Sequence, residues 1–207
     1  MMKSRFNNDL SKEIMLGKYL DVIYHNLFEG FDVKRISDHE QQHKGIDLII
    51  TKNKEEFFID EKAQLDYLEK DLPTFAFEIS YLKDGTQRNG WLFDDNKATH
   101  KYFCITAIGC NEKSNPESGF KSCKITSIDR SLLINLLGSK GLTYERIIKI
   151  NEEIRSGFSE GKIPIQKLNS DEEGYFYFSK SGKSEQPINV VLKLAYLIEN
   201  KAGKRVY

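Results

Sequence analysis

Residues 45–64 read GIDLIITKNKEEFFIDEKAQ, and this stretch decides the fold that the sequence predicts. It contains two short apolar runs, rich in Ile and Phe, on either side of the turn-like segment KNKE. Runs of this length and composition are typical of β-strands, so the stretch predicts a β-hairpin that turns around residues 52–54. In such a hairpin the start of the first strand faces the end of the second. We therefore expect Asp47 to lie across the ladder from Asp60 and Lys62.

The side chains of the second strand divide between its two faces, because successive residues of a strand point in opposite directions. One face would carry three polar side chains, those of Asp60, Lys62 and Gln64. The opposite face would carry Phe57, Ile59 and Glu61. Charged side chains are rarely buried unless they are paired or bind a metal. A strand that changes abruptly from apolar to charged residues therefore predicts a cleft at its end.

Asp47 and Asp60 would provide two carboxylates at that cleft. Mg²⁺ prefers hard oxygen ligands, keeps several waters and takes only one or two carboxylates from a protein, so Mg²⁺ is the expected cofactor, with Mn²⁺ as a substitute. Lys62 could orient the attacking water and offset charge on a phosphate, and the amide of Gln64 could support it. The pattern indicates phosphodiester hydrolysis. A cross-strand salt bridge at the end of a sheet is the simpler interpretation of the same residues.

Helices and further strands are predicted on both sides of the hairpin. Apolar residues at helical spacing predict a first helix over residues 9–27, with Asn7, Asn8 or Asp9 as its N-cap and Gly30 closing it. A short strand over 31–37 and a polar loop over 38–45 precede the hairpin. The later segments predict strands over 74–82, 101–109 and 174–180, helices over 128–137 and 144–154, and a strand that runs into a terminal helix around 192–200. Together these elements predict a mixed α/β or α+β domain.

At this point the sequence resembles the PD-(D/E)XK nuclease superfamily, whose core is a helix followed by strands. That family carries an acidic residue in its second strand and a (D/E)-x-K motif in its third. Asp47 in GID and Asp60 and Lys62 in DEK match this order and spacing, and Gln64 extends the match to the variant (D/E)-x-K-x-Q. Glu61 is not the matched acid, because a lysine would then be required two positions later.

The resemblance covers roughly residues 13–109. It implies a restriction-endonuclease-like core, in which a mixed central sheet is flanked by helices. It also implies a metal-dependent endonuclease with Asp47 and Asp60 as metal ligands, Lys62 as the residue that helps the attacking water, and Gln64 in support.

The family often adds a carboxylate from the first helix, and the candidates in this chain are Glu13 and Asp21. Glu13 is preferred, since it lies one turn before the small residue Gly17, where a close approach to the sheet is easiest. Glu13 is therefore a third expected catalytic residue and metal ligand. The alternative is that Glu13 is a solvated side chain on an amphipathic helix.

A second polar cluster follows the hairpin. Lys83, Arg88 and Trp91 lie in a Gly-rich loop after a predicted strand, and they could hold phosphate and stack a base. Lys44 and His43 precede Asp47 closely and could also touch a phosphate. The alternatives are a surface hairpin with an anchoring tryptophan, and solvated side chains in a polar loop.

The composition excludes several classes of protein. The chain has 31 basic and 31 acidic residues, so no global positive field attracts nucleic acid, and a local basic rim would be needed. Three cysteines without a CxxC pair indicate neither a zinc site nor a disulfide framework. No apolar run is long enough to span a membrane, which favours a cytoplasmic protein without membrane partners. The P-loop, GxSxG and GxGxxG motifs are absent.

The sequence thus predicts a Mg²⁺-dependent nuclease domain over residues 1–168, with a small C-terminal strand and helix addition over 169–207 packed on it. Its expected substrate is nucleic acid, with DNA preferred, and a homodimer would suit cutting of both strands. The main alternative is a catalytically inactive nuclease-fold protein that binds nucleic acid or a protein partner. A protein-interaction module with charges at a strand end is a further alternative.

Overall fold

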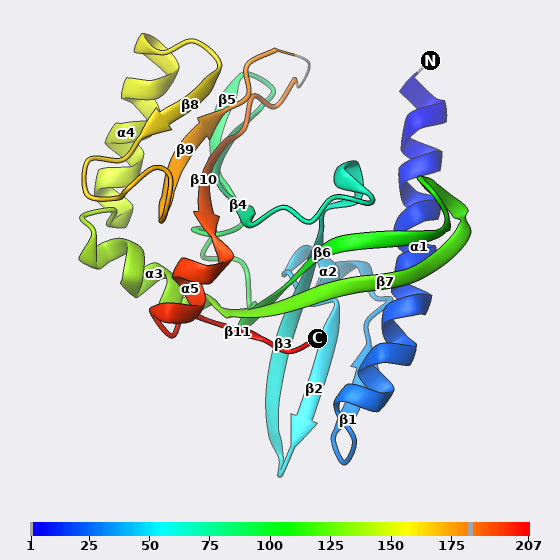
Figure 1. Ribbon diagram of the computed structural model, residues 1–207. Coiled ribbons are helices and arrows are strands. Elements are labelled where there is room, and N and C mark those ends of the chain that lie inside the picture. Colours follow the sequence, from blue (N-terminus) through cyan, green and yellow to red (C-terminus); the bar gives the residue numbers. More distant parts are fainter. Residues whose placement is uncertain (1, 182–183) are drawn as a thin grey trace.

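A computed structural model describes residues 2–181 and 184–207, with side chains described from Ser11 onward (Figure 1). The chain is a mixed α/β protein in which two separate sheets are surrounded by helices. Buried apolar side chains form two clusters, one that includes the N-terminal helix and one face of the first sheet, and one that includes the second sheet together with Tyr102, Cys104 and Ile128 of the first. Within the described residues, no helix combines the length and apolarity needed to cross a membrane. All three cysteines are buried with free thiols.

The first sheet has six strands in the order β1-β2-β3-β6-β7-β11. Its strands are β1 (Asp32–Arg35), β2 (Leu48–Lys52), β3 (Glu55–Ala63), β6 (Lys101–Glu112), β7 (Asn115–Asp129) and β11 (Gly203–Arg205). β1, β2 and β3 form an antiparallel meander, whereas β3 and β6 run parallel. The hairpin predicted from residues 45–64 is therefore confirmed, and Asn53 and Lys54 form its turn with positive φ.

Helix α1 (Met2–Leu27) covers one face of this sheet and packs against the long β6–β7 hairpin (Figure 1). Its buried residues recur every three or four positions, at Leu16, Leu20, Ile23 and Tyr24. The helix begins at Met2, so the N-cap expected at residues 7–9 is wrong. Residues 2–8 contain neither Gly nor Pro, and a helix that is already nucleated extends readily through such a segment.

The second sheet has five strands in the order β5-β4-β10-β9-β8. They are β4 (Thr74–Lys83), β5 (Thr86–Asn89), β8 (Gly161–Pro164), β9 (Gly174–Phe178) and β10 (Ile188–Lys193). Helices α3 (Arg130–Ser139), α4 (Tyr144–Gly157) and α5 (Leu194–Glu199) contribute buried side chains to the same apolar cluster. The C-terminal residues join both sheets, because β10 pairs with β4 and β11 pairs with β7. The division into segments 1–168 and 169–207 stays a prediction.

Several segments differ from the expectation. The polar loop over 38–45 contains a short helix, α2 (His39–His43), whose N-cap is Asp38, because its side chain accepts a hydrogen bond from the Gln41 N–H at 2.9 Å. β7 was not predicted, since Pro116 and Gly119 interrupt its sequence. A one-turn 3-10 helix, η1 (Leu65–Tyr67), follows β3 directly.

Candidate active site

The β2–β3 hairpin brings Asp47 next to Asp60. Leu48 pairs with Ile59 in the ladder, so Asp47, one residue before β2, stands opposite Asp60. The Asp47 N–H donates to the Ile59 carbonyl at 2.8 Å, and the Glu61 N–H donates to Oδ2 of Asp47 at 2.7 Å. These two backbone contacts fix the Asp47 carboxylate at the end of β3.

Burial and the neighbouring carboxylate of Asp60 change the pKa of Asp47. Burial, and next the negative charge of Asp60, raise the pKa of Asp47 to about 6. The Glu61 N–H and the charge of Lys62 act in the opposite direction, but they do not outweigh these two causes. At neutral pH, the positive charge near Asp47 therefore does not fully offset the burial of its carboxylate and the repulsion from Asp60.

Asp60 is almost completely buried, with 2% of its surface exposed. The ammonium Nζ of Lys62 lies 2.5 Å from Oδ1 of Asp60 and forms an ion pair with it. The same ammonium lies over the ring of Trp91, 5.4 Å from its centroid. Asp60 and Lys62 therefore share one face of β3, as the alternation predicted.

Gly45 allows the loop before Asp47 to pack tightly against Asp60. Its φ of +72° favours glycine, and a Cβ at this position would lie 2.4 Å from Oγ1 of Thr99 and 3.2 Å from Oδ2 of Asp60. The Thr99 hydroxyl donates to the Gly45 carbonyl at 2.8 Å. Gly45 and Thr99 were not among the expected site residues, although the GID sequence places a glycine two residues before the acid.

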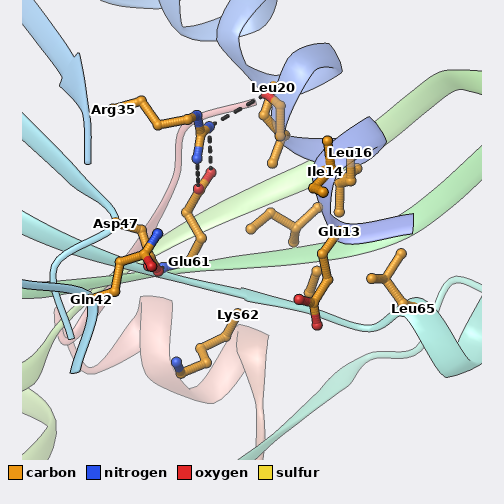
Figure 2. Close-up of a pocket in the computed structure, with 13 residues that line it drawn as sticks. Glu13, Ile14, Leu16, Leu20, Arg35, Gln42, Asp47, Glu61, Lys62 and Leu65 are labelled. Carbon is orange, nitrogen blue, oxygen red and sulfur yellow. Dashed lines mark hydrogen bonds and ion pairs between the residues drawn. The ribbon is translucent and has the colours of Figure 1, made fainter. Parts of the chain in front are cut away.

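A pocket of about 500 Å³ opens between α1 and the ends of these strands (Figure 2). Three of the expected site residues line it: Glu13, Asp47 and Lys62. Figure 2 shows the Glu13 side chain extending from α1 into this space. Asp21, the other candidate on α1, instead forms an ion pair with Arg35. Of the two helix carboxylates, Glu13 is thus the one that lines the pocket.

Glu61 points to the opposite face of β3, toward α1. Its carboxylate accepts hydrogen bonds from Arg35 and from the Tyr24 hydroxyl, the latter at 2.7 Å. Arg35 and Glu61 both line the pocket. Arg35 was not an expected site residue. The sequence indicated it only indirectly, because Glu61 on the apolar face of the strand would need a positively charged partner.

Gln64 lies at the start of η1 rather than within β3. Its amide Nε2 donates to the Thr74 carbonyl at 2.9 Å, while its Oε1 is buried without a hydrogen-bond partner among the described residues. It is not among the residues that line the pocket. The structure therefore places Gln64 next to the strand end and turns its amide toward β4.

The second polar cluster is divided between two places. Lys83 and Arg88 are exposed on the β4–β5 hairpin, which belongs to the second sheet. Trp91 packs against Phe77 and Tyr102 and contacts Lys62. The segment is therefore a surface hairpin followed by an anchoring tryptophan, and phosphate binding by Lys83 and Arg88 stays a prediction.

Lys44 lies at the end of α2, just before the loop that carries Asp47. It forms an exposed i,i+4 ion pair with Glu40, with 2.8 Å between Nζ and Oε1. Its carbonyl accepts a hydrogen bond from the Ala98 N–H at 2.8 Å. The Lys44 side chain thus lies on the surface beside the site.

The side chains of the site that could hold a metal ion are the two carboxylates of Asp47 and Asp60. Among the side chains that the structure describes, no group of three or more His, Cys, Asp or Glu residues is arranged to hold a metal ion. Mg²⁺ takes as few as one or two carboxylates and completes its shell with waters and substrate phosphate. Asp47 and Asp60 are the two carboxylates that could meet this smaller requirement. Asp47 and Glu13 line the pocket, whereas Asp60 is buried and is not among its lining residues.

Comparison of the chain with protein-family models, with curated proteins and with solved structures found no match in any of the three.

Proposed function

We propose that this protein is a Mg²⁺-dependent nuclease that hydrolyses phosphodiester bonds of nucleic acid, with DNA as the expected substrate. One observation carries the proposal: the carboxylate of Asp47 lies next to that of buried Asp60, which pairs with the Lys62 ammonium, and Asp47 and Lys62 line a pocket. The order of helix α1, strand β1 and the β2–β3 hairpin is also the order expected of a restriction-endonuclease-like core. That core is part of the proposal.

The chemistry of the two aspartates fits a divalent cation. Burial raises the pKa of Asp47 most, and repulsion from the neighbouring Asp60 carboxylate raises it further. A cation held by Asp47 and Asp60 would relieve this repulsion, and Mg²⁺ is the ion whose ligand preference suits hard oxygens and few protein groups. When bound, Mg²⁺ supplies polarisation of a phosphoryl oxygen and a lower pKa for a bound water.

The remaining residues of the site have roles that follow from their positions. The Lys62 ammonium orients the attacking water and offsets negative charge that develops on the phosphate. The same ammonium lies over the Trp91 ring. Glu13, on the α1 side of the pocket, would provide a further oxygen to the cation or to its waters.

The ion pair between Asp60 and Lys62 favours a second candidate function, a nuclease-fold protein that binds nucleic acid or a protein without cutting. In this pair Lys62 occupies Oδ1 of Asp60, and Asp60 is buried, so one carboxylate oxygen is already engaged. The nuclease proposal requires Lys62 to move toward substrate, and 30% of its side-chain surface is exposed to allow this.

The test is a cleavage assay with purified protein and Mg²⁺ or Mn²⁺. The substrates are linear and circular double-stranded DNA, single-stranded DNA and RNA, and the variants are Lys62→Ala and the matched control Lys149→Ala, which lies exposed on α4. We expect the parent and Lys149→Ala to cut at least one substrate, and Lys62→Ala to lose at least about 100-fold in rate. Equal cutting by Lys62→Ala would contradict the proposed mechanism. No cutting of any substrate, together with retained binding, would support the second candidate.

A further inference from the structure

We propose that Arg35 and Glu61 are positioning residues that clamp α1 onto β3 and so set the place of Glu13 relative to Asp47 and Lys62. This inference rests on the proposed function for its consequence, because it assigns a purpose to the position of Glu13. The clamp itself is a structural claim that can be tested without metal or substrate.

Arg35 links three secondary-structure elements. From β1, its Nε forms an ion pair with Oδ1 of Asp21 on α1 at 2.6 Å, and its Nη2 reaches the Gly17 carbonyl at 3.4 Å. Its Nη1 forms an ion pair with Glu61 on β3 (Figure 2). Two parallel N–H donors of a guanidinium suit a carboxylate better than a lysine ammonium does. One side chain therefore ties the middle of α1 to the end of β3.

Glu61 strengthens this link from the other side. Its side chain is 12% exposed and also accepts a hydrogen bond from Tyr24, one turn further along α1. A half-buried carboxylate held by both an arginine and a tyrosine hydroxyl has few alternative positions. Tyr24 is thus bound directly to Glu61, while Gly17 and Asp21 are linked to it through Arg35.

The same strand end carries the candidate active site. The backbone N–H of Glu61 donates to Asp47, and Glu61 stands between Asp60 and Lys62 in the sequence. Glu13 lies one helical turn before Gly17, where the clamp begins. A shift of α1 would therefore move Glu13 with respect to Asp47 and Lys62, while Asp60 and Lys62 would stay on their strand.

A gap beside Gly17 allows the arginine to lie close to the helix. A Cβ built at Gly17 would lie 3.7 Å from Cζ of Arg35, which is ordinary contact, whereas a larger side chain would occupy the place of the guanidinium. The absence of a side chain at Gly17 therefore leaves room for the Arg35 guanidinium against α1.

The first experiment measures amide hydrogen exchange in metal-free buffer. The variants are Arg35→Met, the double variant Arg35→Met/Glu61→Gln, the milder Asp21→Asn, and the matched control Arg146→Met, whose exposed ion pair with Glu153 lies on α4. For Arg35→Met we expect amides of residues 16–24 to exchange about tenfold faster than in the parent, with no such change in β9 and β10. Asp21→Asn should give a smaller increase at the same amides, and Arg146→Met none.

The double variant shows whether faster exchange comes from the lost link between α1 and β3 or from the unpaired charge that Arg35→Met leaves on Glu61. Removing both charges should return overall stability close to the parent value, while residues 16–24 keep their faster exchange, because the link to β3 is missing. Parent-like exchange of these residues in Arg35→Met and in Asp21→Asn would overturn the clamp. Parent-like exchange in the double variant alone would also overturn it, because charge compensation would then explain the effect.

The second experiment connects the clamp to Glu13 by Mn²⁺ titration. If the clamp acts through Glu13, Arg35→Met should weaken Mn²⁺ binding in the parent but cause no further loss in a Glu13→Gln background. Additive losses would overturn the inference. A parent protein that binds no Mn²⁺, but whose α1 exchanges faster in Arg35→Met, would contradict the proposed function and leave the clamp supported.

Discussion

The backbone N–H of Glu61 donates a 2.7 Å hydrogen bond to Oδ2 of Asp47. Through this bond, the residue between Asp60 and Lys62 also fixes the acid that precedes β2. The carboxylates of Asp47 and Asp60 therefore meet in a defined arrangement that burial makes unfavourable at neutral pH. An arrangement of this kind costs stability, and a functional requirement for two neighbouring carboxylates would explain it.

Asp47→Asn should stabilise the metal-free protein by about 1 kcal/mol at pH 7, because it removes a buried negative charge and its repulsion with Asp60 while the amide oxygen still accepts the Glu61 N–H. The sign follows from the pKa of Asp47, which the fold raises to about 6. The stabilisation of the parent by protonated Asp47 is complete below about pH 4 and is lost as the pH rises through about 6. Urea denaturation at pH 4 and pH 7 measures this, with the exposed Asp32→Asn as control. A variant less stable than the parent at pH 7 would contradict it.

Lys62→Met should destabilise the protein by about 2 kcal/mol, because buried Asp60 loses its ion-pair partner. The double variant Asp60→Asn/Lys62→Met should recover most of this loss, since no unpaired charge then remains. The measurement is the free energy of unfolding in urea for the parent, both single variants and the double variant. Additive losses in the double variant would show that the two side chains do not compensate each other.

Gly45→Ala should destabilise the protein more than Gly85→Ala does. Both glycines have nearly the same φ, +72° and +73°, so the backbone cost of about 1–2 kcal/mol is common to both. At Gly85 no atom lies within 4 Å of the new Cβ, whereas at Gly45 Oγ1 of Thr99 would lie at 2.4 Å. The difference between the two unfolding free energies therefore measures the packing of the loop beside Asp60. Equal losses would mean that this loop moves freely.

Asp129→Asn should lower the stability of the protein at neutral pH and make that stability less dependent on pH in acid. Burial acts to raise the pKa of Asp129, but hydrogen bonds from Lys101, Ser131 and the Leu132 N–H outweigh it and lower this pKa to about 2. A lowered pKa contributes stability that is present above about pH 4 and is lost as the pH falls toward 2. The parent should therefore be more stable than Asp129→Asn at pH 7, and the difference should shrink at pH 2.5. Thermal unfolding at both pH values measures this, and a difference independent of pH would contradict it.

Local patterns in the sequence predicted the hairpin and the shared face of Asp60 and Lys62, because strand alternation depends only on nearby residues. They did not predict the Arg35–Glu61 ion pair, which joins residues 26 positions apart on non-adjacent strands. They also misplaced Gln64, since β3 ends at Ala63 and η1 turns the glutamine toward β4. The second sheet could not be assembled from the sequence, because it pairs β4 with β10, more than 100 positions later.

The most direct test of the central claim is calorimetric titration of the protein with Mn²⁺ at pH 7. We expect the parent and the control Asp32→Asn to bind one ion, and Asp47→Asn and Asp60→Asn to lose at least about tenfold in affinity, because each removes a hard oxygen ligand. Binding in the parent that Asp47→Asn and Asp60→Asn leave unchanged, or no Mn²⁺ binding to the parent, would contradict the account of Asp47 and Asp60 as a metal site.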